Sequence, residues 1–393
     1  MLSFSTKSDP DRPRTRLEPA FLLHSPNHAK VNAMILELPY ATTGLPGIGG
    51  ALRAAPDHFI VDEAPLYAPQ GDGQHLYVNI TKVGLTTKEV QSQLARVLGL
   101  NRDDVGFAGM KDKHARTTQT FSLSVGHQPP AYADEAAQKI AANVPVTVNW
   151  AAFHRNKLRL GHLLGNRFQI VVSELAIEVA DALQRAEAIF AAIGQRGLPN
   201  YFGPQRLGAN GHNVSEGLAV LRGDAVKRDK WLRRFLLSAY QSYLCNRYLA
   251  RRVETGCFDE LLAGDVAKKY ATGGMFDVVD LAAERPRYAA QEISFTAPIF
   301  GAAMWHAQGA SGELEQAILA EAGVTLDDFA RVRVEGTRRL GRLLVSDLRV
   351  VAHAEGILVS FFLPKGAFAT TVLREVMKTD IAGYAALDET DED

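Results

Sequence analysis

Hydrophobic residues recur at two different periods along the chain. In residues 74–82, Leu76, Val78 and Ile80 share one face and Tyr77, Asn79 and Thr81 share the other, which predicts a β-strand. The same alternation predicts strands at 167–174 and 355–363. Some of these predicted strands have one hydrophobic and one polar face, a pattern that is typical of antiparallel sheets.

Helical spacing alternates with these strands. Thr86 and Glu89 form a capping box, and the apolar residues that follow at helical spacing end at Gly99, so a helix is predicted between them. The spacing also predicts helices at 180–194, 230–255 and 371–378. Strands that alternate with helices predict an α/β protein, of the α+β type, with a mixed and largely antiparallel sheet.

The amino-acid composition is typical of a globular protein with a large hydrophobic core. Of 393 residues, 47% are hydrophobic and 22% are charged, and the length suggests two domains or one domain with an insertion. No run is long or apolar enough to span a bilayer, and we expect no export signal, because the N-terminal residues contain no apolar run with a cleavage site. The two cysteines are too few for a disulfide framework or a zinc site. We therefore expect a cytoplasmic protein without membrane or metal partners. A monomer is expected because the sequence has no coiled-coil heptad and no pronounced apolar stripe.

Charge is distributed unevenly although the formal net charge is only −1. Residues 153–169 hold four cations and no acid, and residues 226–253 hold eight cations against the single acid Asp229. Local basic faces on a neutral protein suit a phosphate-bearing partner bound at chosen places, although a solvated helix face explains them about as well.

Asp112 stands among cations, directly after a glycine turn, in the stretch GFAGMKDKHARTTQTFSL. It is either part of a solvated loop or a base or nucleophile kept ionised in an anion-binding site. No phosphate loop, serine-hydrolase elbow or zinc motif is present in the sequence. A cofactor-free reaction that uses a carboxylate is therefore favoured.

Ordered turns present an aromatic, an amide or a charge in four segments. They are residues 52–63 (LRAAPDHFIVDE), 107–114 (FAGMKDKH), 197–208 (GLPNYFGPQRLG) and 363–370 (LPKGAFAT). In this order, and together with SAYQSYL at 238–244 and EGTRR at 335–339, they resemble the TruD family of tRNA pseudouridine synthases. The resemblance covers residues 44–377.

The resemblance implies a V-shaped molecule and an enzyme that isomerises uridine to pseudouridine at position 13 of tRNA, without a cofactor. It also implies a discontinuous catalytic domain (34–224 and 344–382) and an inserted α/β TRUD domain (225–343). Outside the resemblance we expect a flexible N-terminal extension (1–33), which is polar and contains several prolines, and an acidic tail (383–393). A non-catalytic RNA-binding protein of the same fold is the alternative. An α/β hydrolytic enzyme is disfavoured by the missing motifs.

The resemblance also assigns roles. Asp112 matches the family's essential aspartate, and Phe59, Asn200 and Phe368 match its substrate-contacting residues. We expect three supporting residues, Arg53, Lys111 and Phe202. Arg53 or Lys111 is expected to keep Asp112 ionised, and the family often has Lys in place of Arg53. Without the resemblance, the core is the better explanation for each of the three phenylalanines.

Overall fold

The computed structural model describes residues 37–52, 55–224 and 229–379. The N-terminal extension, Arg53, the last residues of the predicted catalytic domain (380–382) and the acidic tail lie outside these residues. Of Gln205 and Ala209 only the backbone is described.

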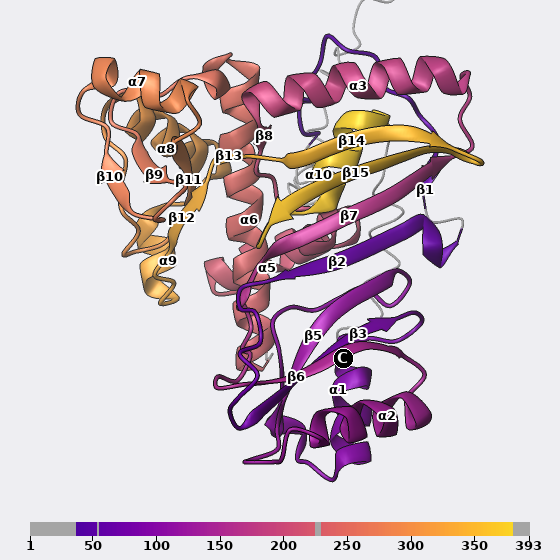
Figure 1. The fold of residues 1–393 in the computed structure, drawn as a ribbon. Coiled ribbons are helices and arrows are strands. Elements are labelled where there is room, and N and C mark those ends of the chain that lie inside the picture. Colours follow the sequence, from indigo (N-terminus) through magenta and orange to yellow (C-terminus); the bar gives the residue numbers. More distant parts are fainter. Residues whose placement is uncertain (1–36, 53–54, 225–228, 380–393) are drawn as a thin grey trace, which may run out of the picture.

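Among the described residues, nine strands form one mixed sheet (Figure 1). Its main path runs β14 (Ser346–His353), β15 (Gly356–Pro364), β7 (Leu163–Ser173), β2 (Phe59–Pro65), β5 (Arg116–Ser124), β3 (His75–Lys82) and β6 (Thr147–His154). Two short strands, β1 (Ala51–Leu52) and β4 (Val105–Phe107), pair with β7 and β5. Only β2 and β5 run parallel in this sheet, so the predicted α/β fold with a mixed, largely antiparallel sheet is confirmed.

Helices cover two halves of one sheet face. One half packs on α1 (Thr87–Leu98) and α2 (Tyr132–Asn143), and the other on α3 (Val179–Arg196) and α10 (Ala369–Met377). The two halves share a face, because Val61 of β2 pairs with Phe168 on one side and with Thr117 on the other, and Thr117 pairs with Lys82. The β2–β5 pair is therefore the seam between two helix-covered halves, and we use "seam" for it below.

A second lobe lies beside this sheet, with the long helix α6 (Lys230–Glu254) between them (Figure 1). Its four-stranded sheet has the order β10 (Met275–Asp277), β9 (Val266–Lys269), β11 (Ile293–Ile299) and β12 (Thr337–Leu340). Its helices are α5 (His212–Arg222), α7 (Leu281–Ala289), α8 (Gly309–Ala322) and α9 (Leu326–Arg331). The core of this lobe begins at Tyr201 and includes α5.

Short elements connect the two lobes. They are β8 (Leu198–Pro199), which pairs with β13 (Arg342–Leu343), and α4 (Pro204–Leu207). The other short helices among the described residues are η2 (Pro56–His58), η3 (Arg102–Asp104), η4 (Ala209–Gly211) and η5 (Cys257–Asp259).

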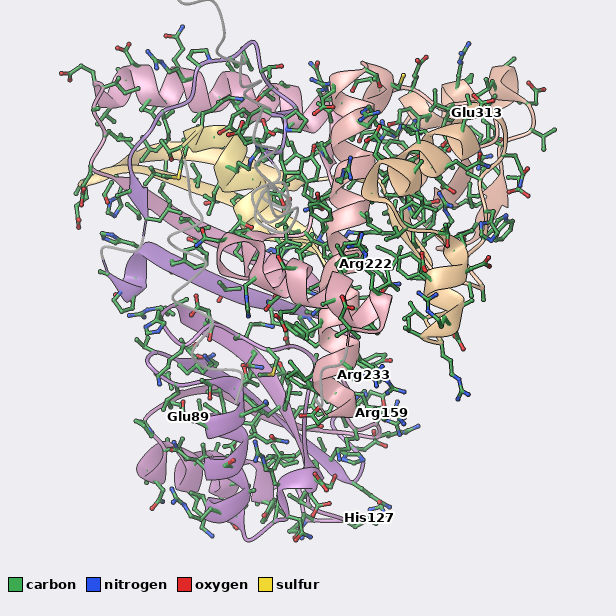
Figure 2. The ribbon with its side chains drawn as sticks, turned by 180° about the vertical axis from the view of Figure 1, so that it is seen from behind. Glu89, His127, Arg159, Arg222, Arg233 and Glu313 are labelled. Atoms are coloured by element: carbon green, nitrogen blue, oxygen red, sulfur yellow. The ribbon has the colours of Figure 1, made fainter. Side chains whose placement is uncertain are left out.

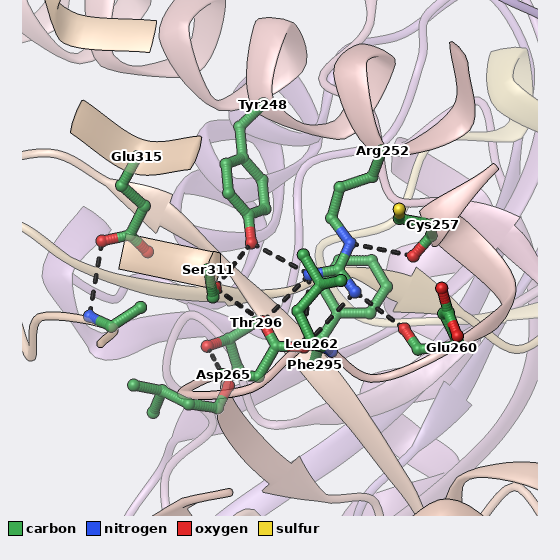
Figure 3. A network of polar contacts seen from close by, with 12 residues as sticks. Tyr248, Arg252, Cys257, Glu260, Leu262, Asp265, Phe295, Thr296, Ser311 and Glu315 are labelled. Atoms are coloured by element: carbon green, nitrogen blue, oxygen red, sulfur yellow. Dashed lines mark hydrogen bonds and ion pairs between the residues drawn. The ribbon is translucent and has the colours of Figure 1, made fainter. Parts of the chain in front are cut away.

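A buried ion pair fixes α6 in the second lobe (Figure 3). The side chains of Arg252 and Asp265 are fully buried, with Nη1 2.9 Å from Oδ1. The Arg252 guanidinium also lies 3.8 Å from the centre of the Phe295 ring. Asp265 accepts further hydrogen bonds from the Ser311 hydroxyl and the Leu262 backbone N–H. All groups of the pair are thus satisfied without water.

The predicted elements agree with the structure to within a few residues. The capping box at Thr86 and the left-handed Gly99 at the end of α1 are both present. The predicted strand at 167–174 starts four residues earlier, at Leu163, because β7 pairs along its whole length with β15 and β2. In the described part of the chain no helix is long and apolar enough to cross a membrane.

Candidate active site

Asp112 lies in the loop that joins β4 to β5, and this loop bridges the two halves of the sheet at the seam. Its neighbour Lys111 donates its backbone N–H to the Thr87 hydroxyl of α1, at 2.9 Å. The Lys111 ammonium is 2.6 Å from Glu63 Oε2 of β2, and both side chains are almost fully buried. The loop is therefore anchored on both sides of the seam immediately before Asp112.

The backbone around Asp112 is also held by hydrogen bonds. Asp112 Oδ1 accepts the His114 backbone N–H at 2.8 Å, which closes a tight turn around the half-buried carboxylate. The Asp112 carbonyl accepts a hydrogen bond from Lys82 Nζ at 2.9 Å, and the Lys113 carbonyl accepts the Gly84 N–H at 2.9 Å. A carboxylate presented from such a turn has little freedom to move.

Lys82 is a part of the site that sequence reasoning missed. It is only 1% exposed, at the end of β3, and its ammonium also donates to the Leu85 carbonyl. A buried lysine is rare, because its charge must be compensated by hydrogen bonds or an opposite charge. The signal was present in the sequence: Lys82 continues the apolar face of the strand that carries Ile80.

The supporting cations differ in what they contact. The ion pair of Lys111 is with Glu63, whose other oxygen Oε1 lies 3.4 Å from the Thr120 backbone N. Its expected effect on Asp112 stays a prediction. Arg53 lies outside the described residues. Arg116, which follows in the same stretch, pairs with the Asp57 carboxylate at 2.5 Å.

A second group of predicted residues gathers where β8, β12 and the start of α10 meet. The Phe202 and Phe368 rings have centres 6.2 Å apart, and Asn200, two residues before Phe202, is buried. Phe202 is fixed through its backbone, since its N–H donates to the Asn246 side chain of α6 and its carbonyl accepts from that same amide. The structure thus joins Asn200 to the two rings.

Arg339 connects this second group, and sequence reasoning did not select it. Its guanidinium donates to Asn200 Oδ1 at 2.6 Å, to the Asn200 carbonyl at 2.9 Å and to the Gly366 carbonyl at 2.9 Å. It also lies 4.1 Å from the centre of the Phe202 ring. Burial lowers the pKa of Arg339, yet an arginine stays charged in proteins. The segment was noted in the sequence, but nothing local shows a contact that spans 139 residues.

Phe59 belongs to a hydrophobic cluster that borders both groups. Phe59 is 7% exposed at the start of β2, with its ring edge-on to Phe168 at 6.4 Å. The cluster includes Ala115, three residues after Asp112, and Ala367 and Ala369 pack against it. Because these two alanines flank Phe368, the Asp112 loop and the Phe368 turn border the same packed region.

The loop at 155–162 joins this region by hydrogen bonds. The Gly161 N–H donates to the Ala108 carbonyl at 2.8 Å, and Lys365 Nζ donates to the Gly161 carbonyl at 3.0 Å. The first basic run of the sequence therefore lies next to both the Asp112 loop and the segment before Phe368. Among the described residues, no group of three or more His, Cys, Asp or Glu could hold a metal ion.

Comparison with known proteins identifies the class of protein to which this chain belongs. A protein of Anaeromyxobacter sp. (strain Fw109-5), described as tRNA pseudouridine synthase D, is 45% identical over 91% of this chain and 99% of its own length. A protein of Thermus thermophilus with the same description is 40% identical over 90% of this chain and 96% of its own length. Pseudouridine synthases isomerise uridine in RNA.

The chain belongs to the TruD family of tRNA pseudouridine synthases, isomerases that convert uridine to pseudouridine in tRNA. The family model described as tRNA pseudouridine synthase D (TruD) matches residues 35–228 and 227–376. The fold also matches a crystal structure of a candidate tRNA pseudouridine synthase D from Methanosarcina mazei, with a TM-score of 0.73 and 24% identity, over 89% of this chain and 98% of that one. The expected family, fold and enzyme class are thereby confirmed.

Proposed function

We propose that this chain isomerises the uridine at position 13 of tRNA and that Asp112 is its catalytic residue. The observation that carries the proposal is the construction of the Asp112 turn. The turn is held by buried Lys82 on one strand and by the buried Lys111–Glu63 pair across the seam. A solvated surface loop needs no such support, whereas a catalytic group must be held within a fraction of an ångström.

The reaction breaks the bond from ribose C1′ to N1 of uracil and forms a bond from C1′ to C5. The proton at C5 is lost and N1 gains one, so no electrons are exchanged and no cofactor is needed. An ionised Asp112 serves this reaction either by attacking C1′ or by removing a proton from the ribose. Deuterium on the ribose carbon next to C1′ separates the two routes, because only proton removal gives a primary isotope effect.

The uridine must leave its stack before it can react, which costs a few kcal/mol. Phe59 and Phe368 are proposed to hold the extruded base and sugar, with stacking worth about 1–3 kcal/mol per base. Asn200 offers amide donors and an acceptor to the uracil edge or the ribose. In the free protein its amide contacts Leu340 and Arg339, so substrate binding must exchange or extend these contacts.

The RNA partner is proposed to be a folded tRNA that meets spaced cations rather than a base code. The loop at 155–162 supports this, since it is basic and lies beside the site.

We propose that the chain acts as a monomer in the cytoplasm. We also propose the division into a catalytic unit (34–224 and 344–382) and an inserted unit (225–343), with the core of the inserted unit extending across that boundary into α5.

Tritium release tests the function directly. Purified protein and an unmodified tRNA transcript carrying tritium at uridine C5 should release tritium to water in an amount equal to one uridine per tRNA. A transcript with cytidine at position 13 should release none. Equal release from both transcripts would contradict position 13, and no release from either would contradict the activity.

Arg339 gives a second test, because it holds Asn200 and Phe202 together. In Arg339→Lys, a compact ammonium lacks the planar fork that reaches these separate oxygens while lying over the ring. Since a hydrogen bond to a charged group is worth about 1.5–3 kcal/mol, kcat/KM should fall about tenfold to hundredfold. Arg285→Lys, at a half-exposed arginine of α7, is the matched control and should keep wild-type kinetics. An Arg339→Lys enzyme within twofold of wild type would show that Asn200 does not depend on this arginine.

A further inference from the structure

An exposed aromatic stack lies on the first two turns of α6. Trp231 is 63% exposed, which is unusual for so large an apolar side chain. Its ring is stacked on Phe235, one helical turn further, with centres 5.7 Å apart and planes only 9° from parallel. The outer ring therefore presents a flat surface that is held in one orientation.

The inner part of this stack is connected to the candidate active site. The Arg206 guanidinium lies 5.1 Å from the centre of the Phe235 ring and also donates to the Ser238 hydroxyl. Arg206 belongs to the same segment as Asn200 and Phe202. The stack is thus continuous with the segment that carries the proposed substrate residue Asn200 and the supporting residue Phe202.

Three exposed cations lie within three positions of Trp231 along α6. Lys230, Arg233 and Arg234 are exposed, and none of them has an ion pair with another residue in the described ranges. The nearest acid in sequence, Asp229, caps the helix by accepting the Leu232 N–H at 2.8 Å. In Figure 2, Arg233 lies near the end of α6 that is farther from Glu313 of α8. A flat apolar surface at the same helix end as several exposed cations is complementary to a nucleotide, with its aromatic base and its phosphate.

We propose that Trp231 is a stacking platform for an unpaired base of the bound tRNA, flanked by phosphate contacts to Lys230, Arg233 and Arg234. This inference rests on the proposed tRNA substrate. The base is not the uridine that reacts. Fifteen residues separate Trp231 from Asn246, which holds Phe202, and at about 1.5 Å per residue this is about 22 Å along α6. Successive phosphates of one strand in a duplex are only about 3.4 Å apart along the axis, so several nucleotides lie between the two places.

Binding and turnover should respond differently at this position. Trp231→Ala should weaken tRNA binding roughly tenfold, the lower part of the range for one stacked base. KM should rise to the same extent, while kcat at saturating tRNA should stay within twofold. Trp231→Phe should recover most of the affinity, because it restores a flat ring. Trp305→Ala, at a second exposed tryptophan (43%) that lies elsewhere in the second lobe, should change neither.

Fluorescence gives a readout that a merely structural role would not produce. The chain has three tryptophans, so Trp150→Phe combined with Trp305→Phe leaves only Trp231 as the emitter. Stoichiometric tRNA should quench this emission, and the unchanged thermal unfolding of each variant shows that it is folded. The binding measurements do not require turnover, so they remain interpretable if no pseudouridine is formed.

Three outcomes would overturn the inference. One is an unchanged tRNA dissociation constant in Trp231→Ala, and another is the absence of quenching in the single-tryptophan protein. The third is a change from dimer to monomer in Trp231→Ala without any change in tRNA affinity, because the ring would then be a contact between two copies of the chain.

Discussion

Asp112→Asn should abolish pseudouridine formation and leave tRNA binding intact. The substitution keeps the size of the side chain and an acceptor for the His114 N–H, which lies 2.8 Å from Oδ1. It removes the charge that either route of the reaction requires. The loss of a group that acts directly on the substrate lowers kcat by about three orders of magnitude or more. Single-turnover tritium release with saturating enzyme measures this, beside a tRNA dissociation constant measured by filter binding.

Asp57→Asn is the matched control for that substitution. Asp57 is a second aspartate close to the seam, but it is exposed and pairs with Arg116. Because exposed ion pairs contribute little, Asp57→Asn should retain most of the wild-type rate. If Asp112→Asn released tritium at a rate within tenfold of wild type, Asp112 would not be the catalytic residue. If it lost tRNA binding instead, its role would be in binding.

Arg252→Met should destabilise the second lobe by about 3–5 kcal/mol, the cost of leaving one partner of a buried ion pair without the other. The Asp265 carboxylate would keep its hydrogen bonds from Ser311 and Leu262 but would lose the guanidinium charge inside a fully buried site (Figure 3). The Phe295 ring would lose its cation as well. Urea unfolding followed by circular dichroism measures the loss.

The neighbouring residue provides the control. Arg251 is partly exposed and pairs with Glu321 at the surface, so Arg251→Met should cost no more than about 1 kcal/mol. Both variants should keep kcat/KM well below their unfolding transitions, since neither residue touches the candidate site. An Arg252→Met protein within about 1 kcal/mol of wild type would mean that the buried pair adds no net stability.

Local features of the fold could be predicted from the sequence, because they depend on neighbours in the chain. The capping box of α1 needs only Thr86 and Glu89, and β3 is marked by its alternating residues. The order of strands in the sheet could not be predicted in this way. The pairing of β7 with β15 joins residues far apart in the chain, such as Ile170 and Val359, and no local pattern encodes it.

In the candidate site, too, residues in local motifs could be predicted from the sequence, whereas residues that act through distant contacts could not. Asp112, Asn200 and Phe368 are found through motifs that each occupy a few consecutive residues. Their supports are different, because Lys82 and Arg339 act on residues 30 and 139 positions away. Only Lys82 left a local signal, a charge on the apolar face of a strand. Arg339 looks like any arginine at the end of a turn until the fold brings Asn200 to it.

The central claim is that the Asp112 side chain meets the ribose of an extruded uridine. A crystal structure of the Asp112→Asn variant bound to unmodified tRNA tests this most directly, since that variant should bind without reacting. We predict that the uridine at position 13 is turned out of its stack, with its C1′ or a ribose hydrogen within about 3–3.5 Å of the side chain at position 112. A complex in which that side chain faces solvent, with every uridine still stacked in the tRNA, would contradict the account.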